Sequence, residues 1–343
     1  MKHVTPPAPI VRERKLTVIV IMSGNILLDI AGPVDVFVTA GKILAAQGAT
    51  DDHDIVLASP GRATQIICSA GIQLNCTTSV LDIQSPIDTL LVAGYSNEAE
   101  NNEYYTDFYA WLSLTARHIR RIGSVCVGAF ALARAGLLNG KQVTTHWEYC
   151  EQLQNSYPEV QVNPNPFFIK DENIYTSGGV SSGMDLALAL IEEDHGKSLA
   201  IQVARKLVIY LTRPGSQASF GALLPGYAIH GTLAGQLRTW IVKHAHTNIG
   251  VVELAAQVNM STRHFSRMFT RETGLSPAKF VEKLRVEIAR KYLEDSPLSI
   301  ESIAEKCGFG GLISMRRIFL RQLLLSPADY RKTFQTALKK DHR

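Results

Sequence analysis

The sequence predicts two domains: an α/β domain with a mainly parallel sheet flanked by helices, and a smaller all-α domain with two helix-turn-helix units. Three observations predict this division. Short apolar runs alternate with helical stretches over roughly the first 195 residues. A segment in the last third of the chain recurs about 50 positions further on. Basic residues concentrate in that same last third.

Length and composition bound the class of protein. The 343 residues are enough for two or three domains, and 46% hydrophobic with 19% charged residues is typical of globular proteins. No apolar run approaches the ~20 residues that span a bilayer, so no membrane partner is expected. Residues 1–14 are polar and rich in proline, which predicts a disordered extension rather than a signal peptide or anchor.

The cysteines point to a reducing compartment. Their number, five, is odd, and they are scattered without the spacing of metal ligands. We therefore expect a cytoplasmic protein that carries neither a metal ion nor a cofactor. They are Cys68, Cys76, Cys126, Cys150 and Cys307.

The N-terminal domain is predicted over 15–211. Unbroken apolar runs are typical of buried parallel strands, and they occur at 16–22, 54–59, 87–94 and 121–126. Helices are predicted between them at 33–48, 104–118, 127–138, within 177–196 after a Gly-rich turn, and at about 197–211. Pro33 is interpreted as a helix N-terminus and Gly48 as the corresponding stop.

The C-terminal domain is predicted over 229–343, after a Pro/Gly/Ser-rich linker at 212–228. From Ile229 onward there are 19 Lys and Arg against 10 Asp and Glu, a balance of +9. Residues Met1–Ala228 hold 16 Lys and Arg against 21 Asp and Glu, a balance of −5. This asymmetry favours a polyanionic partner for the C-terminal domain alone.

The internal repeat sets the architecture of that domain. Val251–Phe280 recurs as Ser299–Tyr330, with Phe269 matching Phe319 and the Ser-Pro pair repeated as well. Each copy is predicted to form two short helices and a tight turn, at about 251–273 and about 299–323. Two such units predict a protein that contacts double-stranded promoter DNA in neighbouring major grooves.

The second helix of the first unit has an apolar and a basic face. Phe265, Met268 and Phe269 are predicted to pack inward. Arg263, Arg267 and Arg271 follow at i, i+4 and i+8 and are predicted to face the DNA.

The second unit repeats this plan. Its outward positions are Ile313, Arg317 and Arg321, with Ser314 and Arg316 beside them. We expect Ile313 to contact a thymine methyl group or a sugar. A connecting helix over 277–295 would hold the two recognition helices about one DNA turn apart, ~34 Å.

The last 100 or so residues resemble the AraC/XylS family of transcriptional regulators. The resemblance rests on "GLSPAKFVEKLRVEIARKYL" and "SIESIAEKCGF…RRIF…SPADYR". It implies that base-facing positions are held by Arg263, Ser266, Arg267, Ile313, Ser314 and Arg317. The chain departs from the family at Leu324, where a glycine is usual; the first copy keeps Gly274 there.

Cys126 lies between a predicted strand and a predicted helix. Such a sharp turn exposes the side chain at a helix N-terminus, where the dipole favours a thiolate. His146 follows a strand in "TTHW", and Asp35 lies in an early helix. Together the three could form a hydrolytic or amidotransfer site.

The region 15–211 is similar to the PfpI-like, class I glutamine-amidotransferase-like fold of GlxA-type regulators. The similarity rests on "LLDIAGPVDVF", "SVCVGAFALARAGLL", "TTHW" and "TSGGVSSGMDLALALIEEDHG". It implies a flavodoxin-like sensor domain that also forms a homodimer, with a pocket at the strand carboxyl ends. The candidate effector-binding residues are Asp35, Gly94, Tyr95, Cys126, Val127, His146 and Trp147.

The enzymatic pattern of that fold is incomplete. Val127 follows the cysteine where peptidase-like members have His, the acid is Asp35 rather than Glu, and Tyr95 stands where enzymes favour a second glycine. The sequence therefore favours a non-catalytic domain that binds a small effector.

Three functional hypotheses remain open. The first is a transcriptional regulator, with activation the usual sense in the family, that responds to a small metabolite such as an amino acid or quaternary amine. Tyr95, Trp147 and Tyr149 offer aromatic faces to a cation. The alternative is a cysteine-dependent hydrolase, amidotransferase or glyoxalase-like enzyme with an appended DNA-binding module. The third is a redox sensor that uses Cys126.

Overall fold

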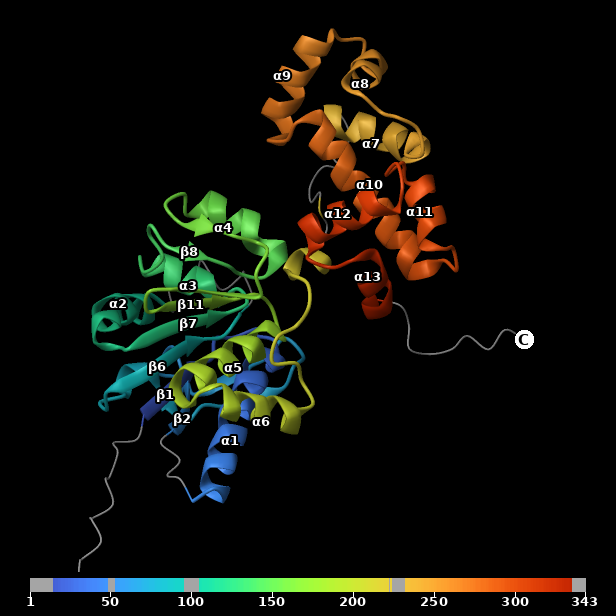
Figure 1. The fold of residues 1–343 in the computed structure, drawn as a ribbon. Coiled ribbons are helices and arrows are strands. Elements are labelled where there is room, and N and C mark those ends of the chain that lie inside the picture. The colour runs from blue at the N-terminus through green and yellow to red at the C-terminus, as the bar shows by residue number, and fades with distance from the viewer. Residues whose placement is uncertain (1–14, 49–52, 96–104, 222, 224–231, 335–343) are drawn as a thin grey trace, which may run out of the picture. The chain divides into compact units, whose positions relative to one another are not determined.

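The computed structural model describes residues 15–48, 53–95, 105–221, 223 and 232–334 (Figure 1). The chain divides into two compact units, Met1–Arg213 and Pro214–Arg343, and each is described by itself. The predicted extension 1–14 and part of the predicted linker, 222 and 224–228, lie outside the described residues.

The first unit is built on a seven-stranded sheet with the order β10-β11-β7-β6-β1-β2-β5. All neighbours are parallel except β10 and β11, which are antiparallel. The bounds are β1 Lys15–Val20, β2 His53–Ser59, β5 Thr78–Ser79, β6 Ile87–Val92, β7 Arg121–Val125, β10 Phe168–Asp171 and β11 Ile174–Ser177. Two small sheets pair β3 Gln65–Ile67 with β4 Gln73–Asn75, and β8 Gln142–Val143 with β9 Gln161–Val162.

Helices cover both faces of the large sheet (Figure 1). Val18 and Val20 of β1 belong to the core shared with α2 and α3, whereas Ile19 belongs to the core shared with α1, α5 and α6. This period-2 alternation is what a strand buried on both faces requires. The helix bounds are α1 Leu27–Ala46, α2 Thr106–Thr115, α3 Gly128–Arg134, α4 Cys150–Ser156, α5 Ser182–His195 and α6 Lys197–Leu207.

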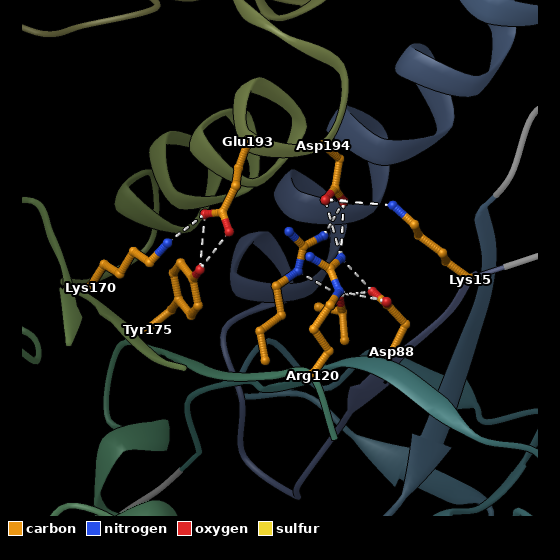
Figure 2. Close-up of polar contacts among 9 residues, drawn as sticks. Lys15, Asp88, Arg120, Lys170, Tyr175, Glu193 and Asp194 are labelled. Atoms are coloured by element: carbon orange, nitrogen blue, oxygen red, sulfur yellow. Dashed lines mark hydrogen bonds and ion pairs between the residues drawn. The ribbon is translucent and has the colours of Figure 1, made fainter. Parts of the chain in front are cut away.

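A network of ion pairs and hydrogen bonds lies at the amino ends of the strands (Figure 2). Arg121, 1% exposed, donates from Nε to the Thr89 hydroxyl at 2.7 Å and pairs with Asp194 of α5. Arg120 and Lys15 also pair with Asp194, at 3.1 and 3.6 Å. Burial alone would raise the pKa of Asp194, but these three cations hold it below its ordinary value.

Helix α1 differs from its prediction. It begins at Leu27, six residues before Pro33, so that Pro33 lies inside the helix. Ile30 in these extra turns packs in the core shared with α5 and α6, and this burial favours the longer helix; Asp29 is buried as well, whereas Leu28 is exposed. Helix α6 ends at Leu207 rather than at Leu211, because Val208 takes a left-handed conformation with φ 57°.

The second unit is all helical where it is described, apart from its N-terminal segment. Helix α10 (Pro277–Asp295) runs through it, with Phe280 and Leu284 in one core and Val286 and Leu293 in the other. Figure 1 shows α8 and α9 toward one end of α10 and α11 and α12 toward the other. The remaining bounds are α7 Leu233–His244, α8 Val251–Gln257, α9 Thr262–Thr273, α11 Ile300–Lys306, α12 Leu312–Leu323 and α13 Pro327–Phe334.

From Pro214 onward, the predicted linker belongs to the second unit. The Ser219 hydroxyl donates to the Leu323 carbonyl at 2.9 Å, and Arg290 of α10 donates to the Gly221 carbonyl at 2.6 Å. The described part of the chain contains no helix both long and apolar enough to cross a membrane.

Candidate functional site

The first candidate site is the outer face of α9. Phe265 and Phe269 are fully buried, and Arg263 and Arg267 are exposed on the opposite side. The Ser261 hydroxyl caps the helix by accepting from the His264 N–H at 3.4 Å. The helix therefore presents two arginines on a surface whose back is fixed by packing.

The second candidate site is the matching face of α12. Met315 and Phe319 are buried, while Ile313 is 87% exposed and Arg316 and Arg317 are exposed beside it. Ile313 thus lies on the outer face of the helix, where the sequence analysis placed it, and its contact with DNA stays a prediction.

The third position of each basic stripe is tied to the protein. Arg321 forms an ion pair with Glu282 of α10, and Arg271 donates to the sulfur of Met268 at 3.2 Å. Met268 is half-buried rather than fully inward. The structure thus leaves the first two positions of each stripe facing outward, with Ser266 and Ser314 half-buried next to them.

The two recognition helices end with the same backbone geometry. Gly274 follows α9 with φ 66°, and Leu324 follows α12 with φ 57°. A left-handed leucine costs about 1 kcal/mol relative to glycine. The second unit therefore keeps the same turn as the first, with a strained backbone at Leu324.

The third candidate site is the turn that carries Cys126, at the carboxyl end of β7. Cys126 has φ 58° and its side chain is 4% exposed. Gly128 makes the turn possible, since a Cβ there would lie 2.2 Å from the Val92 carbonyl oxygen. The strained elbow predicted from "SVCVG" is therefore present, but it is buried.

The cysteine is held as a thiol. Burial, and next the charge of Asp29, raise the pKa of Cys126 far above its ordinary value, although the Val127 and Val180 N–H groups oppose this. The thiolate expected from the helix dipole is thus not favoured.

The acid beside the cysteine is Asp29, which corrects the expectation for Asp35. Asp29 is 1% exposed, its Oδ1 accepts from the Val180 N–H at 3.0 Å, and its Oδ2 lies beside Cys126. Burial raises the pKa of Asp29 to about 6, against the effects of the Val180 N–H and the thiol. Asp35 is exposed, because six residues along a helix turn the side chain about 120° away.

Gly94 fits the gap between acid and thiol. A Cβ at this position would lie 2.5 Å from Asp29 Oδ2 and 2.9 Å from Cys126 Cβ. The next residue, Tyr95, is buried in the core on the α2 and α3 face. Gly94 therefore lies at the predicted site, and Tyr95 packs in the core.

His146 lies next to the turn after β11. A Cβ on Gly179 would be 2.0 Å from His146 Cδ2, so ring and turn are in close contact. Its Nδ1 accepts from the Glu148 N–H at 3.3 Å, and burial lowers its pKa. Trp147 and Tyr149 contact the imidazole at ring distances of 5.4 and 5.8 Å. Burial thus favours the neutral imidazole, which packs against the turn after β11 and two aromatic rings.

We call Cys126, Asp29, Gly94 and His146 the elbow site, and Gly178–Ser182 the elbow turn. Asp29 and the elbow turn were not among the predicted site residues. Asp29 lies in the motif "LLDIAG" and the elbow turn in "SGGVSS", so the sequence did contain a signal for each. Within the described ranges, no three His, Cys, Asp or Glu side chains gather as metal ligands. The site offers one buried carboxylate, one neutral thiol and aromatic rings.

Comparison with known proteins identifies both units. Residues 14–193 match the DJ-1/PfpI family, over more than half of the chain, and residues 254–333 match a helix-turn-helix domain. The chain belongs to the DJ-1/PfpI family. It joins that domain to an AraC-type helix-turn-helix domain, so the predicted family and fold class are confirmed.

Two relatives match over most of the chain and a third over about half of it. The HTH-type transcriptional regulator GbdR of Pseudomonas aeruginosa is 28% identical over 78% of this chain and 72% of its own. The HTH-type transcriptional regulator GlxA of Rhizobium meliloti is 28% identical over 82% and 85%. The isonitrile hydratase of Pseudomonas putida is 32% identical over 52% of this chain and 72% of its own, so the family also includes an enzyme.

Proposed function

We propose that this DJ-1/PfpI family protein is a sequence-specific regulator of transcription that binds promoter DNA and responds to a small molecule at the elbow site. The observation that carries the proposal is the repeated helix with a buried aromatic back and an exposed arginine front, α9 and α12. Relatives of the same two-domain architecture bear the name of transcriptional regulators. We further propose that it acts in the cytoplasm, at the nucleoid, as an activator.

The DNA contacts are assigned to Arg263, Arg267, Ile313 and Arg317, with Ser266, Ser314 and Arg316 at the margin. A duplex selected from a random pool by the full chain serves as probe. Arg267→Ala and Arg317→Ala should each weaken binding by about 1–3 kcal/mol and relax preference at one base pair. Arg205→Ala, an exposed arginine on α6, is the matched control. Equal losses on all duplexes would reduce the two arginines to phosphate contacts.

The effector is proposed to be a small nitrogenous cation, an amino acid or a quaternary amine. The buried Asp29 carboxylate supplies the counter-charge, and the rings of His146, Trp147 and Tyr149 supply apolar faces. Free amino acids, choline and tetramethylammonium are suitable probes in thermal unfolding of the full chain. A binder at 100 times its Kd stabilises by ~2.7 kcal/mol. Asp29→Asn should abolish that shift and Asp35→Asn should keep it.

The alternative is a cysteine-dependent enzyme with an appended DNA-binding domain. The isonitrile hydratase relative and the strained Cys126 favour it. Cys126→Ser separates the two proposals. A regulator keeps ligand-dependent transcription in this variant, whereas an enzyme loses turnover on a panel of amide, aldehyde and isonitrile substrates.

We propose that the protein forms a homodimer through its first unit. Ile26 and Leu28 are exposed at the start of α1, and Ile67 and Ile72 are exposed on the β3–β4 hairpin. The Gly24 N–H donates to the Ile67 carbonyl at 2.9 Å, which places the two segments side by side. Ile67→Lys should convert dimer to monomer in light scattering. Leu114→Lys, at a still more exposed site on α2, should leave the dimer intact.

A further inference from the structure

We propose that the elbow turn, Gly178–Ser182, couples the elbow site to the end of the first unit through Arg213. This inference rests on the proposed function, since it says how occupancy of the site reaches the chain that leads to the DNA-binding unit. Arg213 is the last residue of the first unit, and Pro214 begins the second.

The inner side of the elbow turn holds the site together. The Cys126 N–H donates to the Gly178 carbonyl at 3.1 Å. The Val180 N–H donates to Asp29 Oδ1 at 3.0 Å. Two of the residues that define the site are thus bonded directly to the backbone of this one turn.

The same turn is strained. Val180 has φ 51°, a left-handed conformation that a β-branched residue rarely adopts. Gly179 beside it packs against His146 so closely that no side chain fits. A strained residue persists only while its surroundings hold it, and here the hydrogen bond to Asp29 is one of those restraints.

The outer side of the turn holds Arg213. Its Nη1 donates to the Ser181 hydroxyl at 3.0 Å, and its Nη2 donates to the Ser182 hydroxyl at 3.2 Å. Its Nε donates to Asp185 at 3.2 Å, and the guanidinium lies 4.1 Å from the centre of the Phe167 ring. Four groups from two segments therefore hold this one side chain at the end of the unit.

These contacts give the elbow turn two settings, one in which Asp29 Oδ1 accepts from the Val180 N–H and one in which it does not. A ligand that takes Asp29 Oδ1 for its own hydrogen bond removes the restraint on Val180. The turn then relaxes and its two serines move. Arg213 consequently loses the hydroxyl acceptors that the strained backbone had aligned with its guanidinium. A ligand shifts this equilibrium only by its differential affinity for the two settings, and the coupling is reciprocal.

Hydrogen exchange of the full chain without ligand or DNA tests the coupling. Asp29→Ala removes the acceptor and should speed exchange both in 178–182 and in 208–213 by on the order of fivefold, the value of one lost hydrogen bond. Asp35→Ala, on the exposed face of the same helix, is the matched control and should change neither segment.

The reverse experiment uses Arg213→Met, which keeps an apolar stem over Phe167 and removes every donor. It should speed exchange in 178–182 and around Cys126 to a similar extent. The double variant should show no more exchange than the larger single change, as expected for one shared element.

One pattern overturns the proposal: faster exchange at 178–182 in Asp29→Ala with 208–213 unchanged. If Asp29→Ala unfolds the unit, Arg213→Met decides alone: it must speed exchange in the elbow turn, and an unchanged elbow turn overturns the proposal. No DNA enters these measurements, so failure of the coupling is distinguishable from failure of the regulator proposal, which duplex binding decides separately.

Discussion

The two ends of the large sheet each bury a carboxylate and treat it in opposite ways. At the amino ends, Asp194 is surrounded by Lys15, Arg120 and Arg121, and its pKa is lowered (Figure 2). At the carboxyl ends, Asp29 faces a thiol and a backbone N–H, and its pKa is raised to about 6. The same residue type therefore stabilises the fold through ion pairs at one end, whereas at the other its buried negative charge lowers the stability of the folded state.

Left-handed residues other than glycine occur at both ends, with Glu172 in the β10–β11 turn at the amino ends and two examples, one buried and one half-buried, at the carboxyl ends. Cys126 and Val180, both at the carboxyl ends, have positive φ values without being glycine. Strain and incompletely paired polar groups persist in proteins where the surrounding fold outweighs them, and they gather at functional sites. The amino ends therefore hold a fully paired carboxylate, and the carboxyl ends, where we propose the effector site, hold a buried one with a raised pKa.

The largest expected effect tests the amino end. Arg121→Met leaves Asp194 without its most buried partner, and should destabilise the first unit by about 3–5 kcal/mol in urea unfolding. Lys170→Met removes the exposed ion pair with Glu193 and should cost less than ~1 kcal/mol. Equal effects of the two variants would show that the network is only a surface feature.

The next prediction is that neutralising the buried carboxylate changes the free energy of unfolding in opposite directions at the two ends of the sheet. Asp194→Asn should destabilise the first unit, because three cations lose their counter-charge. Asp29→Asn should stabilise it at pH 7.5 by about 1–3 kcal/mol, because the amide keeps an acceptor for Val180 and avoids a buried charge. Unfolding of both variants under identical conditions measures the comparison. A destabilised Asp29→Asn protein would mean that the carboxylate is well paired.

The pH dependence should separate the ends as well. Asp29 has a folded pKa of about 6, above its unfolded value of 3.8, so the folded state binds more protons in this window. Its unfavourable contribution therefore fades as the pH falls from 7 to 4, and the advantage of Asp29→Asn should shrink with it. The pKa of Asp194 is lowered, so its stabilisation is present above about 4 and is lost as the pH falls further. An advantage of Asp29→Asn that stays constant from pH 7 to 4 would contradict the shift.

The features that could be predicted from sequence are those with a local signal. Apolar runs predicted four of the parallel strands, β1, β2, β6 and β7, and the repeat with its 3.6-residue periodicity predicted both recognition helices, with Phe265 and Phe269 inside. The elbow at Cys126 was also predictable, because a strand that runs directly into a helix needs a sharp turn.

The rest depends on contacts between distant segments. Pro33 favoured a helix start that would have excluded Asp29, whereas burial of the preceding turns extends α1 to Leu27. The ion pair of Arg321 with Glu282 follows from the packing of α12 on α10, and the protonated Cys126 follows from burial. None of these can be seen in a single segment of sequence.

The smallest expected effect concerns strain itself. Val180→Gly should relieve the left-handed valine of the elbow turn and stabilise the first unit by about 0.5–1 kcal/mol, after the entropy cost of a glycine. Glu172→Gly, at a left-handed position in the β10–β11 turn, replaces an unbranched residue and loses an ion pair with Lys141, so it should gain less. Thermal unfolding resolves the difference as a few degrees. Equal gains would place no more strain at the carboxyl end than in an ordinary turn, and the functional meaning given to Val180 would then rest on its hydrogen bond to Asp29 alone.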